Sequence, residues 1–234
     1  MLLREVDGAV IAIGQASHAW ISGQLARAWD PRPEPYEAVC LAAEQHDVGM
    51  AQWDLTPTLN PATGLPTTFI EMDLDTHVRL WSAAPARLLT QSRYAALLVS
   101  LHGSRLYGLR DLAAMDPRDA DQIRTWEATQ QVFRARLIAE LGADPQVLRA
   151  QQALLWTWDS LSLGLLLGWE TFTVEGITLR DGAVLDPWPL SVPELTVACD
   201  GRRLEGRFTD AAAMHAALEA APYVPLSFTL RPPG

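Results

Sequence analysis

The sequence predicts a mainly α-helical protein that carries a short N-terminal hairpin and a small β-rich C-terminal segment. Apolar residues recur at intervals of three and four along most of residues 1–168, which is the period of a helix with one buried face. Short β-prone runs occupy the two ends of the chain, next to Asp-Gly pairs that are typical of tight turns. We therefore expect a helical domain over residues 1–168 and a β-rich segment over residues 169–234 that packs on it.

The N-terminal residues predict a hairpin followed by two helices. Leu2–Val6 and Ala9–Ile13 are β-prone runs on either side of Asp7-Gly8, a pair that supplies the positive φ angles of a tight turn. Helical spacing then extends over 15–29 and, after a proline-rich break, over 35–48.

A long loop is expected between these helices and the rest of the helical body. Residues 53–68 are rich in proline, threonine and glycine, and a loop of this length inside a domain is commonly functional. Further helices are expected at 75–91, 94–107, 119–141 and 145–167. The last of these is the most apolar, but it carries Asp159 near its middle, so we expect a buried helix rather than a membrane span.

The C-terminal residues predict short strands and one helix. The runs TFTVEGITL, ELTVACDGRRLEGRF and PLSFTLRP are β-prone, and Asp181-Gly182 and Asp200-Gly201 are expected to form turns. A small helix is expected at 210–220.

Composition excludes several function classes. The net charge is −10 and all 18 basic residues are arginine, without a basic run, which argues against nucleic-acid and membrane-surface partners. Charges at Arg4, Glu5 and Asp7 interrupt the apolar start that a signal peptide needs, and the two cysteines form no disulfide framework. We therefore expect a cytoplasmic protein and leave a homodimer open. The acidic balance does not argue against a small anionic substrate as its partner, drawn to a local metal ion.

Five polar residues stand where the apolar pattern predicts hydrophobic ones: His18, His46, Asp47, His102 and Asp159. A buried carboxylate is costly unless it is paired or binds a metal, and the chain has no lysine to pair with Asp159. Imidazole and carboxylate together suit a divalent ion such as Mn, Fe, Co, Ni or Zn, and Mg is also considered. Each residue alone is more simply a hydrogen-bonded core residue, but the set predicts a metal site in the helical core.

The order His18, His46-Asp47 and a distant Asp159 resembles the HD superfamily of metal-dependent phosphohydrolases. In that superfamily a helical bundle presents H…HD…D to one or two divalent ions. The chain more closely resembles a bacterial family of uncharacterised HD-like proteins, through QASHAWISGQLARAW, EQHDVGMAQWD, YAALLVSLH and LLWTWDSLSL. This resemblance covers roughly residues 1–168 and implies an HD-like helical bundle.

The resemblance implies a metal-dependent hydrolase that acts on a small phosphorylated or nucleotide-like substrate through a metal-activated water. The ligands would be His18, His46, Asp47 and Asp159, joined by His102. Three residues are candidates for catalysis. Asp47 would accept the proton of the water, and Arg105 would bind phosphate. Asp54 in the following loop would either support the ligands by a hydrogen bond or act as a general base.

Two departures from the HD pattern leave other functions open. Met50 stands where many HD phosphohydrolases have a lysine, and His77 and His102 do not clearly match the spacing of the extra histidines of two-metal members. If these two histidines complete a second site, the chain would resemble HD-fold oxygenases that hold two irons. A non-enzymatic protein that binds a metal or an apolar ligand is the third alternative. His215 is expected to be structural or exposed.

Overall fold

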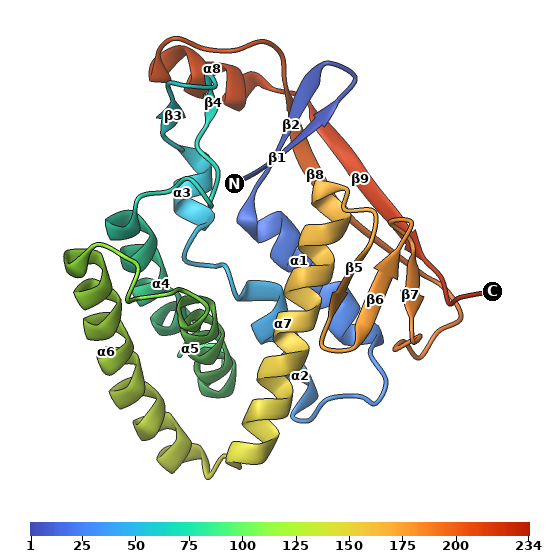
Figure 1. Ribbon diagram of the computed structural model, residues 1–234. Helices are drawn as coiled ribbons and strands as arrows, with labels where there is room; N and C mark the ends of the chain where they lie inside the picture. The colour runs from blue at the N-terminus through green and yellow to red at the C-terminus, as the bar shows by residue number, and fades with distance from the viewer.

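The computed structural model describes all 234 residues and contains eight helices and nine strands (Figure 1). The helices are α1 (Gln15–Ala28), α2 (Tyr36–Gln45), α3 (Ala51–Leu55), α4 (Leu74–Leu88), α5 (Arg93–Gly108), α6 (Pro117–Leu141), α7 (Pro145–Leu167) and α8 (Ala211–Ala220). The strands are β1 (Leu2–Val6), β2 (Ala9–Ile13), β3 (Leu59–Asn60), β4 (Leu65–Pro66), β5 (Phe172–Val174), β6 (Ile177–Arg180), β7 (Val184–Asp186), β8 (Leu195–Leu204) and β9 (Tyr223–Leu230).

The predicted fold class, a mainly α HD-like bundle, is wrong, because the protein is mixed α/β. Half of the residues (50%) are helical, but 19% lie in strands that form sheets of four, two and three strands. The N-terminal hairpin is not a separate appendage, since β2 pairs antiparallel with β8 and β8 pairs with β9. Both ends of the chain therefore build one sheet in the order β1-β2-β8-β9, and this pairing crosses the domain boundary expected at residue 168.

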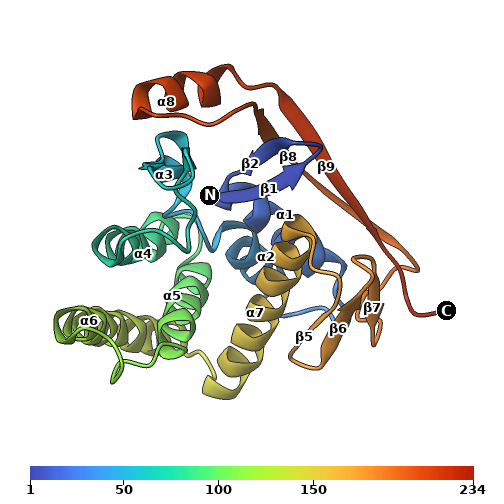
Figure 2. The ribbon, with the colours of Figure 1, turned by 45° about the horizontal axis from the view of Figure 1, so that its top comes forward.

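The sheet meets the helical body mainly through β8, with a smaller contact between β1 and α7, and its most apolar strand, β2, lies between these two strands. All five residues of β2, AVIAI, are buried, and β8 lies against α1. Figure 2 shows α1, α2 and α7 between this sheet and the outer helices α4, α5 and α6. The two helices that pack most closely on α1 are α2 and α7, so the middle of the body is the meeting point of three helices.

One predicted turn is wrong for a reason of packing. Asp200-Gly201 lies inside β8, where Gly201 pairs with Val224 of β9. A Cβ at this glycine would lie 2.4 Å from Cγ2 of Ile11, so the residue lets β2 approach β8 closely rather than reversing the chain. Asp7-Gly8 and Asp181-Gly182 do form turns, and all four of these residues have positive φ.

Replacing Gly201 with valine is expected to destabilise the fold, because the new side chain would overlap Ile11 in a buried part of the sheet. We expect a loss of about 2–3 kcal/mol in the free energy of unfolding. Urea denaturation measures this loss in the free energy of unfolding. Gly108→Ala provides a control for glycine replacement without a clash or backbone strain, since nothing lies within 4 Å of that position and its φ is not positive. Equal losses for the two variants would contradict the packing explanation.

The segment expected to be a long loop contains structure of its own. Residues 53–68 include the end of α3 and the short hairpin of β3 and β4, in which Leu59 pairs with Pro66. The other helices lie within a few residues of their expected positions, because caps define them: Asp73, Ser92, Asp116 and Asp144 each accept a bond from a backbone N–H of the first helical turn. None of the helices combines the length and the apolar character that crossing a bilayer requires.

Candidate metal centre

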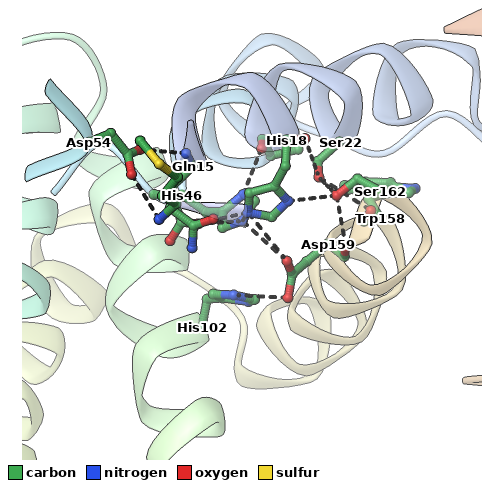
Figure 3. Close-up of polar contacts among 12 residues, drawn as sticks. Gln15, His18, Ser22, His46, Asp54, His102, Trp158, Asp159 and Ser162 are labelled. Atoms are coloured by element: carbon green, nitrogen blue, oxygen red, sulfur yellow. Dashed lines mark hydrogen bonds and ion pairs between the residues drawn. The ribbon is translucent and has the colours of Figure 1, made fainter. Parts of the chain in front are cut away.

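The five predicted ligand residues come together at the junction of α1, α2, α5 and α7 (Figure 3). His18 lies on α1, His46 and Asp47 follow the end of α2, His102 lies on α5 and Asp159 on α7. All five are buried, with exposed fractions between 1% and 7%. Four segments that are far apart in the sequence thus place nitrogen and oxygen atoms at one point in the core.

The ligand atoms lie close to one another. The Nε2 atom of His18 is 2.7 Å from Oδ2 of Asp47 and 3.2 Å from Nε2 of His46. Nε2 of His46 is also 3.4 Å from Oδ1 of Asp159. Oδ2 of the same carboxylate is 3.5 Å from Nε2 of His102. These atoms form two overlapping sets, His18–His46–Asp47 and His46–His102–Asp159, and within each set the atoms lie within 4.8 Å of one another.

Outer hydrogen bonds determine which nitrogen of His46 faces the centre. Its Nδ1 lies 2.9 Å from the carbonyl oxygen of Ala43, which can only accept, so Nδ1 carries the proton. The Nε2 atom of the neutral ring therefore presents a lone pair to the centre.

A hydrogen bond to Ser162 likewise determines which nitrogen of His18 faces the centre. The hydroxyl of Ser162 donates to the carbonyl oxygen of Asp159 at 2.8 Å, so it accepts the bond from Nδ1 of His18 at 2.7 Å. Ser22 donates to Ser162 from the other side at 3.1 Å, and both serines are fully buried. His18 thus also presents its Nε2 lone pair to the centre.

This donor set fits a divalent cation. Two imidazole lone pairs and a carboxylate oxygen face one another with no hydrogen between them when both rings are neutral, and such an arrangement of acceptors needs a proton or a metal ion. The imidazole and carboxylate types suit Mn, Fe, Co, Ni and Zn. Hydrogen bonds from the outer ring nitrogens are the usual support of metal-binding histidines.

The charges of the centre respond to burial and to the neighbouring groups. Burial lowers the pKa of His46, but the carboxylates of Asp47 and Asp159 outweigh this effect and raise it to about 9. Burial raises the pKa of both carboxyl groups, yet the surrounding imidazoles hold each of them below its usual value. Burial dominates at His102 and lowers its pKa to about 4. Two ionised carboxylates therefore attract positive charge into a buried site.

A cavity of about 180 Å³ adjoins the cluster, and all five predicted ligands line it. Its other walls are mostly apolar and aromatic, including Phe69, Trp81, Trp156 and Trp169. Trp81 and Trp156 also hold the ring of His102, each with a centroid distance of 5.7 Å. Trp169 is 43% exposed, so the cavity meets solvent beside this residue.

Two of the proposed catalytic residues lie elsewhere. Asp54 pairs with the amine of Met1 at 2.8 Å and accepts a bond from the backbone N–H of Gln15 at 2.5 Å, so its carboxylate joins the N-terminus to the start of α1. Arg105 forms an ion pair with Glu175 and lies over the ring of Trp156, 4.8 Å from its centroid. Neither side chain lines the cavity.

The remaining histidines have different surroundings. His77 lines the same cavity, and its Nδ1 lies 2.6 Å from the hydroxyl of the buried Tyr107. Burial, assisted by Arg110, lowers the pKa of His77 to about 4. His215 bonds to the carbonyl oxygen of Pro57 and holds α8 against the segment before β3, which is a structural contact.

Sequence reasoning missed several residues of the cavity. Gln15 lies three residues before His18, and Trp81 lies four residues after His77. Helical spacing of three or four from a predicted ligand was therefore a usable signal. No such signal points to Phe69, which comes from the segment between β4 and α4.

The fold and this centre define a mixed α/β protein with a buried His/Asp cluster that can hold a metal ion. The chain belongs to the family described as "Protein of unknown function (DUF3891)", which matches residues 1–206. Searches of curated proteins and of solved structures found no match. The relationship to HD phosphohydrolases stays a prediction from the sequence motifs.

Proposed function

We propose that the cluster holds one divalent metal ion and that the protein uses it to hydrolyse a small phosphorylated or nucleotide-like substrate. The observation that carries the proposal is the convergence of the Nε2 lone pairs of His18 and His46 on the carboxylates of Asp47 and Asp159. The adjoining cavity gives a substrate access to this point. Each function proposed here depends on that combination of ligands and space.

A bound divalent ion would lower the pKa of a coordinated water and polarise a phosphoryl oxygen. The role of the chain is to hold the ion and to orient its ligands. Ser162 and the carbonyl of Ala43 fix the rings of His18 and His46, so that little reorganisation accompanies binding. The pKa of Asp47 is held low, which makes it a persistent anion and a weak proton acceptor. We therefore assign Asp47 to holding the ion rather than to general-base catalysis.

In this proposal the metal ion, rather than an arginine, compensates the negative charge of the substrate. Arg105 is already paired with Glu175, on the face of Trp156, and does not line the cavity. Its role would be to fix Trp156, which forms part of the cavity wall, and only indirectly to affect the substrate.

A panel of phosphoesters tests the hydrolase. We expect the protein loaded with Mn, Co or Zn to release product from at least one small phosphoester, and the Asp47→Ala variant to lose at least about 100-fold in kcat/KM. Arg93→Ala is a matched control, because this exposed arginine pairs with Glu140 far from the cavity. Absence of metal-dependent turnover on monoesters, diesters and nucleotides alike would overturn the hydrolase proposal.

A second candidate is the two-iron oxygenase, and one observation favours it. His77 lines the same cavity as the cluster and is not among the groups that form it, so it is available as a ligand for a second ion. The number of metal ions bound per chain separates this candidate from the hydrolase with one ion.

A further inference from the structure

The cavity beside the cluster has no arginine and no lysine in its walls. Its fixed charges are the carboxylates of Asp47 and Asp159, and no arginine lines it. The chain contains no lysine. One divalent ion with two ionised carboxylates and neutral imidazoles gives a centre whose net charge is zero.

This charge balance limits what the cavity can accept. A phosphate monoester brings two negative charges near neutral pH, and no arginine or lysine of the wall would compensate them. A buried charge without a partner is strongly disfavoured, and the cost rises with each further charge. A monoanion, such as a phosphodiester, leaves only one charge for the ion to meet.

Gln15 supplies a polar group that nothing in the protein uses. Its side chain is 3% exposed, lines the cavity, and has an Oε1 atom without a hydrogen-bond partner. Its backbone N–H donates to Asp54, which fixes the residue at the first turn of α1, close to His18 (Figure 3). A buried amide oxygen left without a partner is unfavourable and would accept a bond from a donor on a bound molecule, whereas Nε2 of the same amide can donate to an anionic oxygen. A carboxamide offers both donor and acceptor atoms and carries no charge.

The other lining residues suit an apolar body of limited size. Phe69, Leu106, Leu163 and the three tryptophans Trp81, Trp156 and Trp169 supply hydrophobic surface. The volume of about 180 Å³ lies below the range of about 300–1,000 Å³ that is usual for pockets that bury drug-sized ligands. A nucleoside triphosphate would therefore exceed the cavity in both size and charge.

We infer that the site takes a small organic monoanion of the phosphodiester type, with an apolar body against the aromatic walls and an anionic oxygen that accepts a hydrogen bond from the uncharged side-chain amide Nε2 of Gln15. This inference rests on the proposed hydrolase with one metal ion and names the substrate class of that same site. Gln15 is a specificity-determining residue in this arrangement, since it replaces the basic side chain that a dianion would need.

Two probes that differ by one charge test the inference. p-Nitrophenyl phosphate is a dianion at pH 8, and its methyl ester is a monoanion with the same aromatic body. Isothermal titration of the Mn-loaded protein at pH 8 should show at least tenfold tighter binding of the methyl ester. Equal or tighter binding of the dianion would overturn the inference, and so would failure of both probes to bind at 10 mM.

Two variants of Gln15 test its part in recognition. Gln15→Leu should weaken binding of the methyl ester about tenfold, and Gln15→Arg should shift the preference at least tenfold toward the dianion. Both variants should keep the metal stoichiometry of the wild type, and unchanged affinities in both would overturn the role of Gln15.

Release of p-nitrophenolate in the same samples separates the two proposals. Selective binding of the monoanion without release supports the substrate class but contradicts the hydrolase. Faster hydrolysis of the dianion supports the hydrolase and overturns the substrate class.

Discussion

Replacement of Asp159 by asparagine is expected to lower the affinity for Mn by at least about 100-fold. The carboxylate lies between His46 and His102, with one oxygen facing each ring, and it carries half of the anionic charge of the centre. Asparagine keeps the shape of the aspartate side chain but removes its negative charge. The loss of Mn affinity therefore reports on the missing ligand charge rather than on a packing defect. Isothermal titration at pH 8 measures the affinity.

Asp75→Asn is the matched control for this variant. Asp75 is an exposed carboxylate on α4 that pairs with Arg118 and lies outside the cavity. Its replacement should leave Mn affinity unchanged. Circular dichroism of both variants checks that the fold is retained, and an Asp159→Asn protein that binds Mn as tightly as the wild type would contradict the assignment of this ligand.

The free energy of unfolding is expected to depend strongly on pH in the presence of a chelator. The pKa of His46 is raised to about 9 in the folded protein, above its usual 6.5. The folded state therefore binds the extra proton, and this contribution is complete below pH 6.5 and is lost as the pH rises through 9. The expected loss is on the order of 3 kcal/mol, because one pKa unit corresponds to about 1.4 kcal/mol.

Two other histidines are expected to lower the stability of the folded protein at acidic pH. The pKa values of His77 and His102 are lowered to about 4, so the unfolded chain takes up protons before the folded protein does. Their contribution to stability is present above pH 6.5 and is lost as the pH falls toward 4, by on the order of 2 kcal/mol each at pH 5. From these three histidines, the metal-free protein should be most stable near pH 6.5.

Bound Mn should oppose the loss of stability that the metal-free protein shows as the pH rises above 6.5. Ligands bind metal in their deprotonated form, so protons compete less as the pH rises from 6 to 9. Denaturation in urea with excess Mn should therefore show a stabilisation by metal that grows over this range. A stabilisation by Mn that is the same at pH 6 and pH 9 would contradict the role of His46 as a ligand.

The residues of the His/Asp cluster were predictable because they broke a local apolar pattern. His18, His102 and Asp159 stand in apolar helical segments, and the packing of α1, α5 and α7 brings these segments together. The sheet was not predictable in the same way. In the sequence, β2 and β8 are separated by the whole helical body, and the residues of neither strand specify the other as its pairing partner.

Asp54 and Arg105 show the limit of reasoning from neighbouring positions in the sequence. Both were chosen because they follow predicted ligands closely, but the partners that engage them, the amine of Met1 and the carboxylate of Glu175, come from distant parts of the chain. Gln15 is the opposite case, since its distance of three residues from His18 was visible in the sequence and its burial was not.

The number of divalent ions bound per chain tests the central claim most directly. Protein purified without chelator, dialysed against Mn at pH 8 and measured by plasma emission spectroscopy should contain one ion per chain, and the Asp159→Asn variant should contain none. A wild-type protein without stoichiometric metal would contradict the account, and two ions per chain would favour the candidate in which His77 completes a second site.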